Sequence, residues 1–184
     1  MKIIQQPAEC LILLKTNFYH DDRGIFYESY SKKKYNGIGI VDNFVQSNIS
    51  ISKKNVLRGL HYRNLKPQSQ LLTIIDGEIF DVVVDLRKDS KTFLKSFSYL
   101  LKSDGTVNQI FMGKGFAHGF LVLSNEATLH YKVSEIYDAN DDYGLIWNDP
   151  DLNIKWPTRK IKISDKDNNN CLLYTSPSPR DSGK

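Results

Sequence analysis

The sequence is poor in the features that mark disulfide-rich, membrane-spanning and nucleic-acid-binding proteins. Only two of its 184 residues are cysteines, Cys10 and Cys171, which gives no disulfide framework and is typical of a reducing compartment. No apolar run approaches the ~20 residues of a membrane span, and no signal-peptide pattern opens the chain. We therefore expect a cytoplasmic protein without a membrane partner.

Charge of one sign is also scarce. The net charge is +4, and the one tight basic run, the three lysines at 32–34, suits a solvated loop or helix face better than a nucleic-acid patch. With 40% hydrophobic and 25% charged residues, the composition is that of an ordinary globular protein. The length suits one domain with a full core, and we expect no nucleic-acid partner.

The last residues differ in composition from the rest. Three asparagines at 168–170 precede a Ser/Pro-rich segment, and residues 171–181 resemble the in-frame translation of a sequencing adaptor. The alternative is a genuine disordered tail. In either case we expect a single domain over residues 1–170 and a non-native or disordered tail over residues 171–184.

Short β-branched and aromatic runs separated by turn residues dominate the chain. Asp76-Gly77 predicts a hairpin, Asp22-Arg23-Gly24 a turn, and residues 32–35 a short helix. We expect strands at residues 10–14, 25–30, 44–52, 71–75, 78–86, 93–101, 109–112, 115–123 and 128–133. Many short strands at fairly even spacing predict a mainly β protein, an antiparallel sandwich or a jelly-roll barrel with few short helices.

Two of these segments carry polar residues of interest. In residues 44–52, Gln46, Asn48 and Ser50 share one face of the expected strand, which either faces water or lines a polar cavity. In residues 56–63, a strand would send Arg58 and His61 to opposite faces, but Gly59 can break the alternation with a bulge or bend. The alternative for this stretch is a surface arginine and a structural histidine.

Several motifs follow one another in order between about residues 10 and 167. They are Arg23-Gly24 with Phe26 and Glu28, Gln46-Ser47-Asn48, residues 56–62 and 80–87, residues 115–120, Tyr131-Lys132, Tyr137, and residues 147–150 and 164–167. Together they resemble the dTDP-4-dehydrorhamnose 3,5-epimerase family, isomerases with a cupin-type jelly roll. The resemblance implies epimerisation at C3 and/or C5 of a dTDP-linked 4-keto-6-deoxyhexose, a step in deoxysugar and surface-polysaccharide biosynthesis.

The chemistry of that reaction explains the residues. A 4-keto group acidifies the protons on C3 and C5, because the carbanion delocalises as an enolate. Inversion needs a base on one face, an acid on the other and a donor to the enolate oxygen. The resemblance makes His61 the base, Asp167 its partner and Tyr131 the acid, with no cofactor. Without the resemblance, Asp167 is an exposed charge and Tyr131 a core tyrosine.

The resemblance also implies a substrate-binding set. Arg23 and Arg58 would bind the diphosphate, Tyr137 would stack on the nucleotide base, and Phe26 and Glu28 would approach it from the other side. In the family, N-terminal strands exchange between two subunits, which implies a homodimer whose partner supplies some contacts. The remaining expected contacts are Gln46, Ser47, Asn48, Gln70, His118, Asp142 and Lys166.

The chain departs from the family pattern at two positions. Gln70 stands where the family has a lysine facing the ketone oxygen. We expect either weaker enolate stabilisation, unless the nearby Lys66 substitutes for the charge, or a different substrate or extent of epimerisation. Asp142 stands where the family usually has glutamate, one methylene longer.

Other functions remain open at this point. A metal site is not expected, because the His-x-His pair of metal-binding cupins is absent, and His130 would face away from Tyr131. Alternative functions are a 3- or 5-only epimerase, a 3,4-ketoisomerase, whose Arg-Gly-x-His-Ala-His motif the chain lacks, and a non-catalytic sugar-nucleotide-binding cupin.

Overall fold

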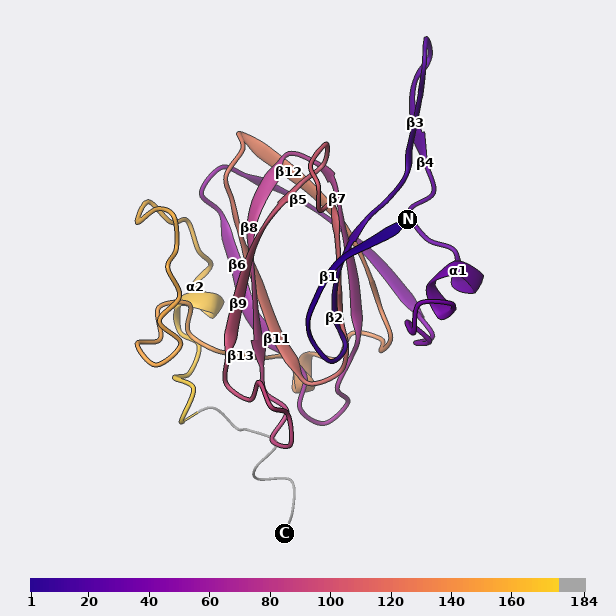
Figure 1. Ribbon diagram of the computed structural model, residues 1–184. Helices are drawn as coiled ribbons and strands as arrows, with labels where there is room; N and C mark the ends of the chain where they lie inside the picture. The colour runs from indigo at the N-terminus through magenta and orange to yellow at the C-terminus, as the bar shows by residue number, and fades with distance from the viewer. Residues whose placement is uncertain (176–184) are drawn as a thin grey trace.

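The computed structural model describes residues 1–175 and consists mainly of two antiparallel sheets that face each other as a barrel (Figure 1). The first sheet has the order β1-β2-β10-β7-β12-β5, and the second has the order β13-β6-β11-β8-β9. Their strands are β1 (Lys2–Ala8), β2 (Leu11–Lys15), β5 (Gln46–Lys53), β6 (Leu57–Tyr62), β7 (Gln70–Asp76), β8 (Glu78–Asp85), β9 (Ser96–Lys102), β10 (Gln109–Met112), β11 (Phe116–Val122), β12 (Glu126–Val133) and β13 (Tyr143–Gly144).

The remaining elements are small and lie outside the barrel. β3 (Phe18–Asp21) and β4 (Gly24–Tyr27) form a hairpin that projects away from the two sheets (Figure 1). The helical elements are α1 (Lys32–Asn36), the 3₁₀ turn η1 (Ala139–Asp141) and α2 (Asp165–Asn168). None of the helices in residues 1–175 is long and apolar enough to cross a membrane.

The two sheets enclose the main hydrophobic core. Leu72 of β7 and Leu129 of β12 meet Val83 of β8 and Phe120 of β11 in one buried cluster. Two further clusters cover the outer faces. The C-terminal segment packs over the five-stranded sheet, and α1 with the residues after it packs over the six-stranded sheet. Since several central strands are buried on both faces, they read as continuous apolar runs.

The structure confirms the mainly β jelly roll and corrects one connection. β7 and β8 do not form the hairpin predicted from Asp76-Gly77, because β7 pairs with β10 and β12 while β8 pairs with β9 and β11. Gly77 has a φ of +85°, and a Cβ there would lie 2.3 Å from the carbonyl oxygen of Glu126. The turn therefore passes the chain from one sheet to the other against β12. Three strands, β1, β3 and the two-residue β13, were not expected.

The first residues of the expected tail lie against the domain. The backbone of Cys171 forms an isolated β-bridge with that of Leu145, and the buried Leu173 donates its backbone N–H to Asp149 Oδ2 at 2.7 Å. The boundary at residue 170 remains a prediction, and residues 176–184 of the expected tail fall outside the described residues.

Candidate active site

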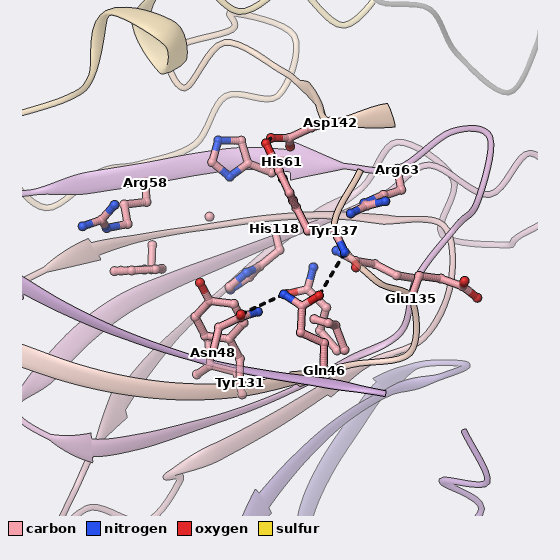
Figure 2. Close-up of a pocket in the computed structure, with 16 residues that line it drawn as sticks. Gln46, Asn48, Arg58, His61, Arg63, His118, Tyr131, Glu135, Tyr137 and Asp142 are labelled. Carbon is pink, nitrogen blue, oxygen red and sulfur yellow. Dashed lines mark hydrogen bonds between the residues drawn. The ribbon is translucent and has the colours of Figure 1, made fainter. Parts of the chain in front are cut away.

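A polar cavity of about 240 Å³ lies between the two sheets, with residues of both in its walls (Figure 2). β5, β7 and β12 form one wall, β6 and β11 form the other, and the segment after β12 closes one end. The lining residues are Gln46, Asn48, Arg58, His61, Arg63, Gln68, Gln70, Leu72, His118, Gly119, Phe120, Tyr131, Val133, Glu135, Tyr137 and Asp142.

The β6 strand brings both Arg58 and His61 into this cavity, as predicted. The pairing with β11 shifts between His118↔His61 and Phe120↔Arg58, so one extra residue lies on β6. Gly59 has a φ of +117°, and the peptide bond that follows it is cis. This irregularity turns both side chains to the same face.

His61 is paired with a buried carboxylate on α2. The His61 Nε2 lies 2.7 Å from Asp167 Oδ1, and the Gly59 N–H donates to Asp167 Oδ2 at 3.2 Å. Ser164, the N-cap of α2, accepts the Asp167 N–H at 3.1 Å and so helps to place the carboxylate. With Nε2–H donated to an ionised Asp167, Nδ1 is the basic nitrogen of the neutral ring.

Opposing effects set the charge of Asp167. Burial by itself raises the pKa of this carboxyl. The hydrogen bond and charge of His61, the Gly59 N–H and nearby Lys166 outweigh burial and hold the pKa below its usual value. Asp167 therefore stays ionised and fixes the orientation of His61.

Tyr131 faces His61 from the opposite wall. It lies on β12 and its hydroxyl points into the cavity, whereas His61 reaches in from β6 (Figure 2). Burial raises the pKa of the Tyr131 phenol, and the charge of Arg58 offsets part of this increase. The hydroxyl thus keeps its proton at neutral pH and is available as a donor.

A second histidine–carboxylate pair lies next to the first. His118 on β11 is directly opposite His61 in the strand register, and its Nε2 lies 2.7 Å from Oδ2 of the buried Asp81. Asp81 orients the His118 ring toward the cavity. The sequence motif contained Asp81, but its pairing depends on the contact between β8 and β11, which the sequence did not show.

Polar side chains connect the wall to the cavity mouth. The Tyr137 N–H donates to Gln46 Oε1 at 3.0 Å, and Gln46 Nε2 donates to Asn48 Oδ1 at 2.9 Å (Figure 2). At the mouth, Asp142 Oδ2 accepts from the Tyr137 hydroxyl at 3.2 Å and from Lys166 Nζ at 2.5 Å. Asp142 is therefore the link between Tyr137 and Lys166, although it is shorter than glutamate.

The polar face of β5 that carries Gln46 and Asn48 lines a cavity and does not face bulk water. Their stripe faces the cavity, while Ile49 and Ile51 of the other stripe are 68% and 61% exposed. Strand alternation sends Ser47 outward as well, where it accepts a hydrogen bond from Lys132 Nζ at 3.2 Å. The Ser47 side chain therefore does not line the cavity of its own chain, and its expected contact with substrate stays a prediction.

Three other expected contacts lie on or beside the projecting hairpin, away from the cavity of their own chain. Arg23 is paired with Asp21, and its side chain is 86% exposed. Phe26 is 72% exposed, and Glu28 contacts Lys34 at 2.9 Å. Their expected contact with substrate stays a prediction that requires a second subunit.

The cavity also contains residues that the sequence interpretation did not select. Arg63, Gln68 and Glu135 line it. Because side chains two residues apart on a strand share a face, the position of Arg63 two residues after His61 could have predicted from the sequence that Arg63 lines the cavity. Lys66, considered as a substitute for charge at Gln70, is exposed and does not line the cavity. Its backbone N–H instead donates to Asp141 at 2.7 Å.

Within residues 1–175, no three His, Cys, Asp or Glu side chains form a group suited to hold a metal ion. His130, which was expected to face away from Tyr131, pairs with Ile49 and does not line the cavity. The expectation that the protein works without a metal or cofactor remains a prediction.

A jelly roll with a histidine–carboxylate pair on one wall and a partly buried tyrosine on the facing wall defines a cupin of the acid–base type. The family model described as dTDP-4-dehydrorhamnose 3,5-epimerase matches residues 6–174. A dTDP-4-dehydrorhamnose 3,5-epimerase of Methanothermobacter thermautotrophicus is 41% identical over 179 residues, 96% of each chain.

Solved structures agree with this match. The dTDP-6-deoxy-D-glucose-3,5-epimerase of Legionella pneumophila, in complex with dTDP-4-keto-L-rhamnose, has a TM-score of 0.90 at 40% identity, covering 95% of this chain and 93% of that chain. The dTDP-4-dehydrorhamnose 3,5-epimerase of Bacillus anthracis, with TDP and PPi bound, has a TM-score of 0.90 at 43% identity, covering 94% and 99%. This chain belongs to the dTDP-4-dehydrorhamnose 3,5-epimerase family, which confirms the family predicted from the sequence motifs.

Proposed function

We propose that this chain inverts C3 and C5 of a dTDP-linked 4-keto-6-deoxyhexose, the conversion of dTDP-4-dehydro-6-deoxyglucose into dTDP-4-dehydrorhamnose. The observation that carries the proposal is the position of the His61–Asp167 pair and the Tyr131 hydroxyl on facing walls of one cavity. The names of the relatives support the reaction, and their bound dTDP sugar and TDP support the substrate class.

The geometry suggests the following steps. His61 Nδ1 takes the proton from C3 or C5, and the C–H electron pair moves to the C4 oxygen as an enolate. Tyr131 gives its hydroxyl proton to the same carbon from the other face, which inverts the centre. Solvent then reprotonates the tyrosinate and takes the proton from the imidazolium, so no cofactor is consumed. Positioned acid–base groups of this kind contribute roughly 10²–10⁴ in rate.

The rest of the cavity suits a nucleotide diphosphate. Arg58 is exposed at one end of the cavity, where a guanidinium can donate two parallel hydrogen bonds to phosphate oxygens. The amides of Gln46 and Asn48 and the ring of His118 supply further polar contacts. Tyr137, which is 58% exposed, offers a ring face for the base.

We further propose that the active form is a homodimer in the cytoplasm. The cavity of about 240 Å³ is smaller than the roughly 300–1,000 Å³ of typical ligand sites, so one chain encloses only part of a nucleotide sugar. The hairpin of Arg23 and Phe26 projects from the barrel with its side chains exposed, which suits insertion into a second copy. The exposed Ile49 and Ile51 on β5 provide an apolar surface for the same partner.

Solvent deuterium incorporation tests the proposal. With dTDP-4-dehydro-6-deoxyglucose in D₂O, we expect deuterium at both C3 and C5 of the product by mass spectrometry and NMR. The His61→Asn variant should lose exchange at both carbons and keep its affinity for TDP, and Tyr131→Phe should fail to complete inversion. Exchange that survives in His61→Asn contradicts the assignment of the base.

The same experiment separates the alternatives. Label at one carbon alone identifies a 3- or 5-only epimerase, and movement of the keto group identifies a 3,4-ketoisomerase. No label under saturating substrate leaves a non-catalytic sugar-nucleotide-binding cupin, which is the alternative that the neutral Gln70 favours.

A further inference from the structure

The proposed reaction needs a strong donor at the enolate oxygen. Negative charge develops on O4 as the C–H proton leaves, and a fixed donor there accounts for roughly 10²–10³ in rate in comparable sites. Gln70 is neutral. Among the described residues that line the cavity, the permanently charged cations are Arg58 and Arg63.

Arg63 differs from Arg58 in its surroundings. Arg58 is exposed, and its Nε donates to Ser52 Oγ at 3.0 Å. Arg63 is 7% exposed, and its Nη1 is buried with no hydrogen-bond partner in residues 1–175. Leaving a charged donor unpaired in a buried position is unfavourable, and an oxygen of a bound molecule would remove this cost. The low local dielectric also strengthens its interaction with a developing negative charge.

The strand register places Arg63 at one edge of the proposed sugar position. Arg63 follows His61 by two residues on the same face, a rise of about 6–7 Å along the strand direction. On the facing wall, Val133 follows Tyr131 by two residues and pairs with Gln70. Gln46 also pairs with Val133, and in Figure 2 it lies on the side of the cavity where Arg63 lies. A ring held between His61 and Tyr131 therefore has Arg63 and Gln70 beyond the same edge.

Arg58 lies beyond the other edge of the ring. Figure 2 shows Arg58 and Arg63 on opposite sides of His61. In a pyranose, C1 and C4 are likewise on opposite sides of the ring, and the diphosphate is attached at C1. If Arg58 holds the diphosphate and the nucleotide folds back over the cavity mouth to stack its base on Tyr137, O4 points toward the end of the cavity that contains Arg63.

We propose that the Arg63 guanidinium donates an N–H to O4 of the sugar and stabilises the enolate, supplying the positive charge that Gln70 lacks. This inference rests on the proposed epimerase function. No proton is transferred by Arg63: the C–H electron pair moves to O4, the proton moves to His61, and the arginine keeps its charge throughout.

A purely supporting role for Arg63 predicts a different result. Its Cζ lies 5.6 Å from the centre of the Tyr137 ring. Burial raises the pKa of Asp141, whereas backbone hydrogen bonds to this carboxyl and the charge of Arg63 lower it, so that the pKa lies below its usual value. If Arg63 only held Tyr137 in place, its loss would weaken nucleotide binding and leave exchange at saturating substrate unchanged. If it stabilises the enolate, the saturated rate falls and TDP affinity persists.

The test uses the full chain and measures deuterium exchange at saturating substrate together with TDP affinity by calorimetry. The variants are Arg63→Gln, Arg63→Lys, Gln70→Lys and the double variant Arg63→Gln/Gln70→Lys. Arg159→Gln is the matched control, because it removes the same charge at an exposed position outside the cavity. Thermal unfolding shows which variants fold.

We expect Arg63→Gln to lower saturated exchange by roughly 10²–10³, with TDP affinity within about threefold of the original. Arg63→Lys should retain most of the original rate, and Gln70→Lys should rescue the rate of Arg63→Gln by about tenfold or more. Exchange within about threefold in Arg63→Gln overturns the inference, as does a loss of TDP affinity alone.

Two further outcomes are decisive. If Arg63→Gln does not fold, the Gln70→Lys variant of the original chain decides the question. A gain of about tenfold in its saturated exchange rate overturns the inference, because it would show that no positive charge was already present at O4. If the original chain shows no exchange at either carbon, the proposed function fails. Exchange in the original chain with an unaffected Arg63→Gln refutes the role of Arg63 alone.

Discussion

Replacing Asp85 with asparagine should destabilise the protein by removing one buried charge. The Asp85 carboxylate is fully buried at the end of β8 and accepts hydrogen bonds from three neighbours in the turn that follows. They are Arg87 Nε and Nη2 at 2.9 and 2.7 Å, Ser90 Oγ at 2.6 Å and Thr92 Oγ1 at 2.6 Å. Arg87 also lies over the Phe116 ring at 4.3 Å, so the network fastens the turn to β11.

The magnitude follows from the charge of this group. Burial by itself raises the pKa of Asp85, but the hydrogen bonds from Arg87, Ser90 and Thr92 outweigh it and lower the pKa from 3.8 to about 2. Because each tenfold change in proton affinity is worth about 1.4 kcal/mol, lowering the pKa this far stabilises the fold by about 2 kcal/mol. Because the folded-state pKa is the lower one, this stability is fully present above pH ~4 and is lost as the pH falls from there to ~2.

Urea unfolding of the original chain and Asp85→Asn tests the value. At pH 7 the variant should lose about 2 kcal/mol, or more where Arg87 is left without its partner. The difference should narrow as the pH falls below ~4, because the original chain then loses its charged carboxylate. Asp104→Asn is the control, since its contact with Lys102 is long at 3.5 Å and exposed. A loss below about 0.5 kcal/mol at pH 7, or a difference independent of pH, refutes the reasoning.

Three other changes give distinct outcomes. Gly59→Ala should lower the unfolding free energy by about 2 kcal/mol or more, because a Cβ there lies 2.5 Å from the β11 backbone. Gly39→Ala is the control for the positive φ alone, because Gly39 has a φ of +87° and open space around it. Equal losses in the two variants would show that the clash with β11 does not contribute. Asp167→Asn should lower exchange by about 10²-fold by releasing the His61 ring, with TDP affinity retained; an unchanged rate would exclude this role. Phe26→Ala should weaken TDP binding, because the exposed side chain lies on the hairpin that is proposed to reach the base in a second copy. Unchanged TDP affinity would remove the hairpin from the site.

The sequence predicted what depends on local pattern. The alternation of Gln46 and Asn48 with Ile49 is visible in the chain itself, and the structure only decided which stripe faced inward. Gly59 likewise indicated the irregularity in β6 from the sequence alone, since glycine adopts a φ of +117° without strain from a side chain.

Long-range partners could not be predicted in the same way. Asp76-Gly77 has the composition of a hairpin turn, but turn chemistry does not state which sheet the next strand joins. His118 was selected without Asp81, whose position beside it depends on the register of two strands 37 residues apart. Ser47 was selected as part of a tripeptide motif, although a strand turns only every second side chain to one face.

The outer stripe of β5 has a consequence for handling the protein. Of the described strands, β5 contacts only β12 in its sheet, so one of its edges has unpaired backbone groups beside the exposed Ile49 and Ile51. Such an edge is a template for unwanted strand pairing between newly made chains. Lys53 and Lys54 at the end of the strand act as charged gatekeepers against this. Solubility of the single chain should therefore depend on ionic strength and on these two lysines, even though neither lines the cavity.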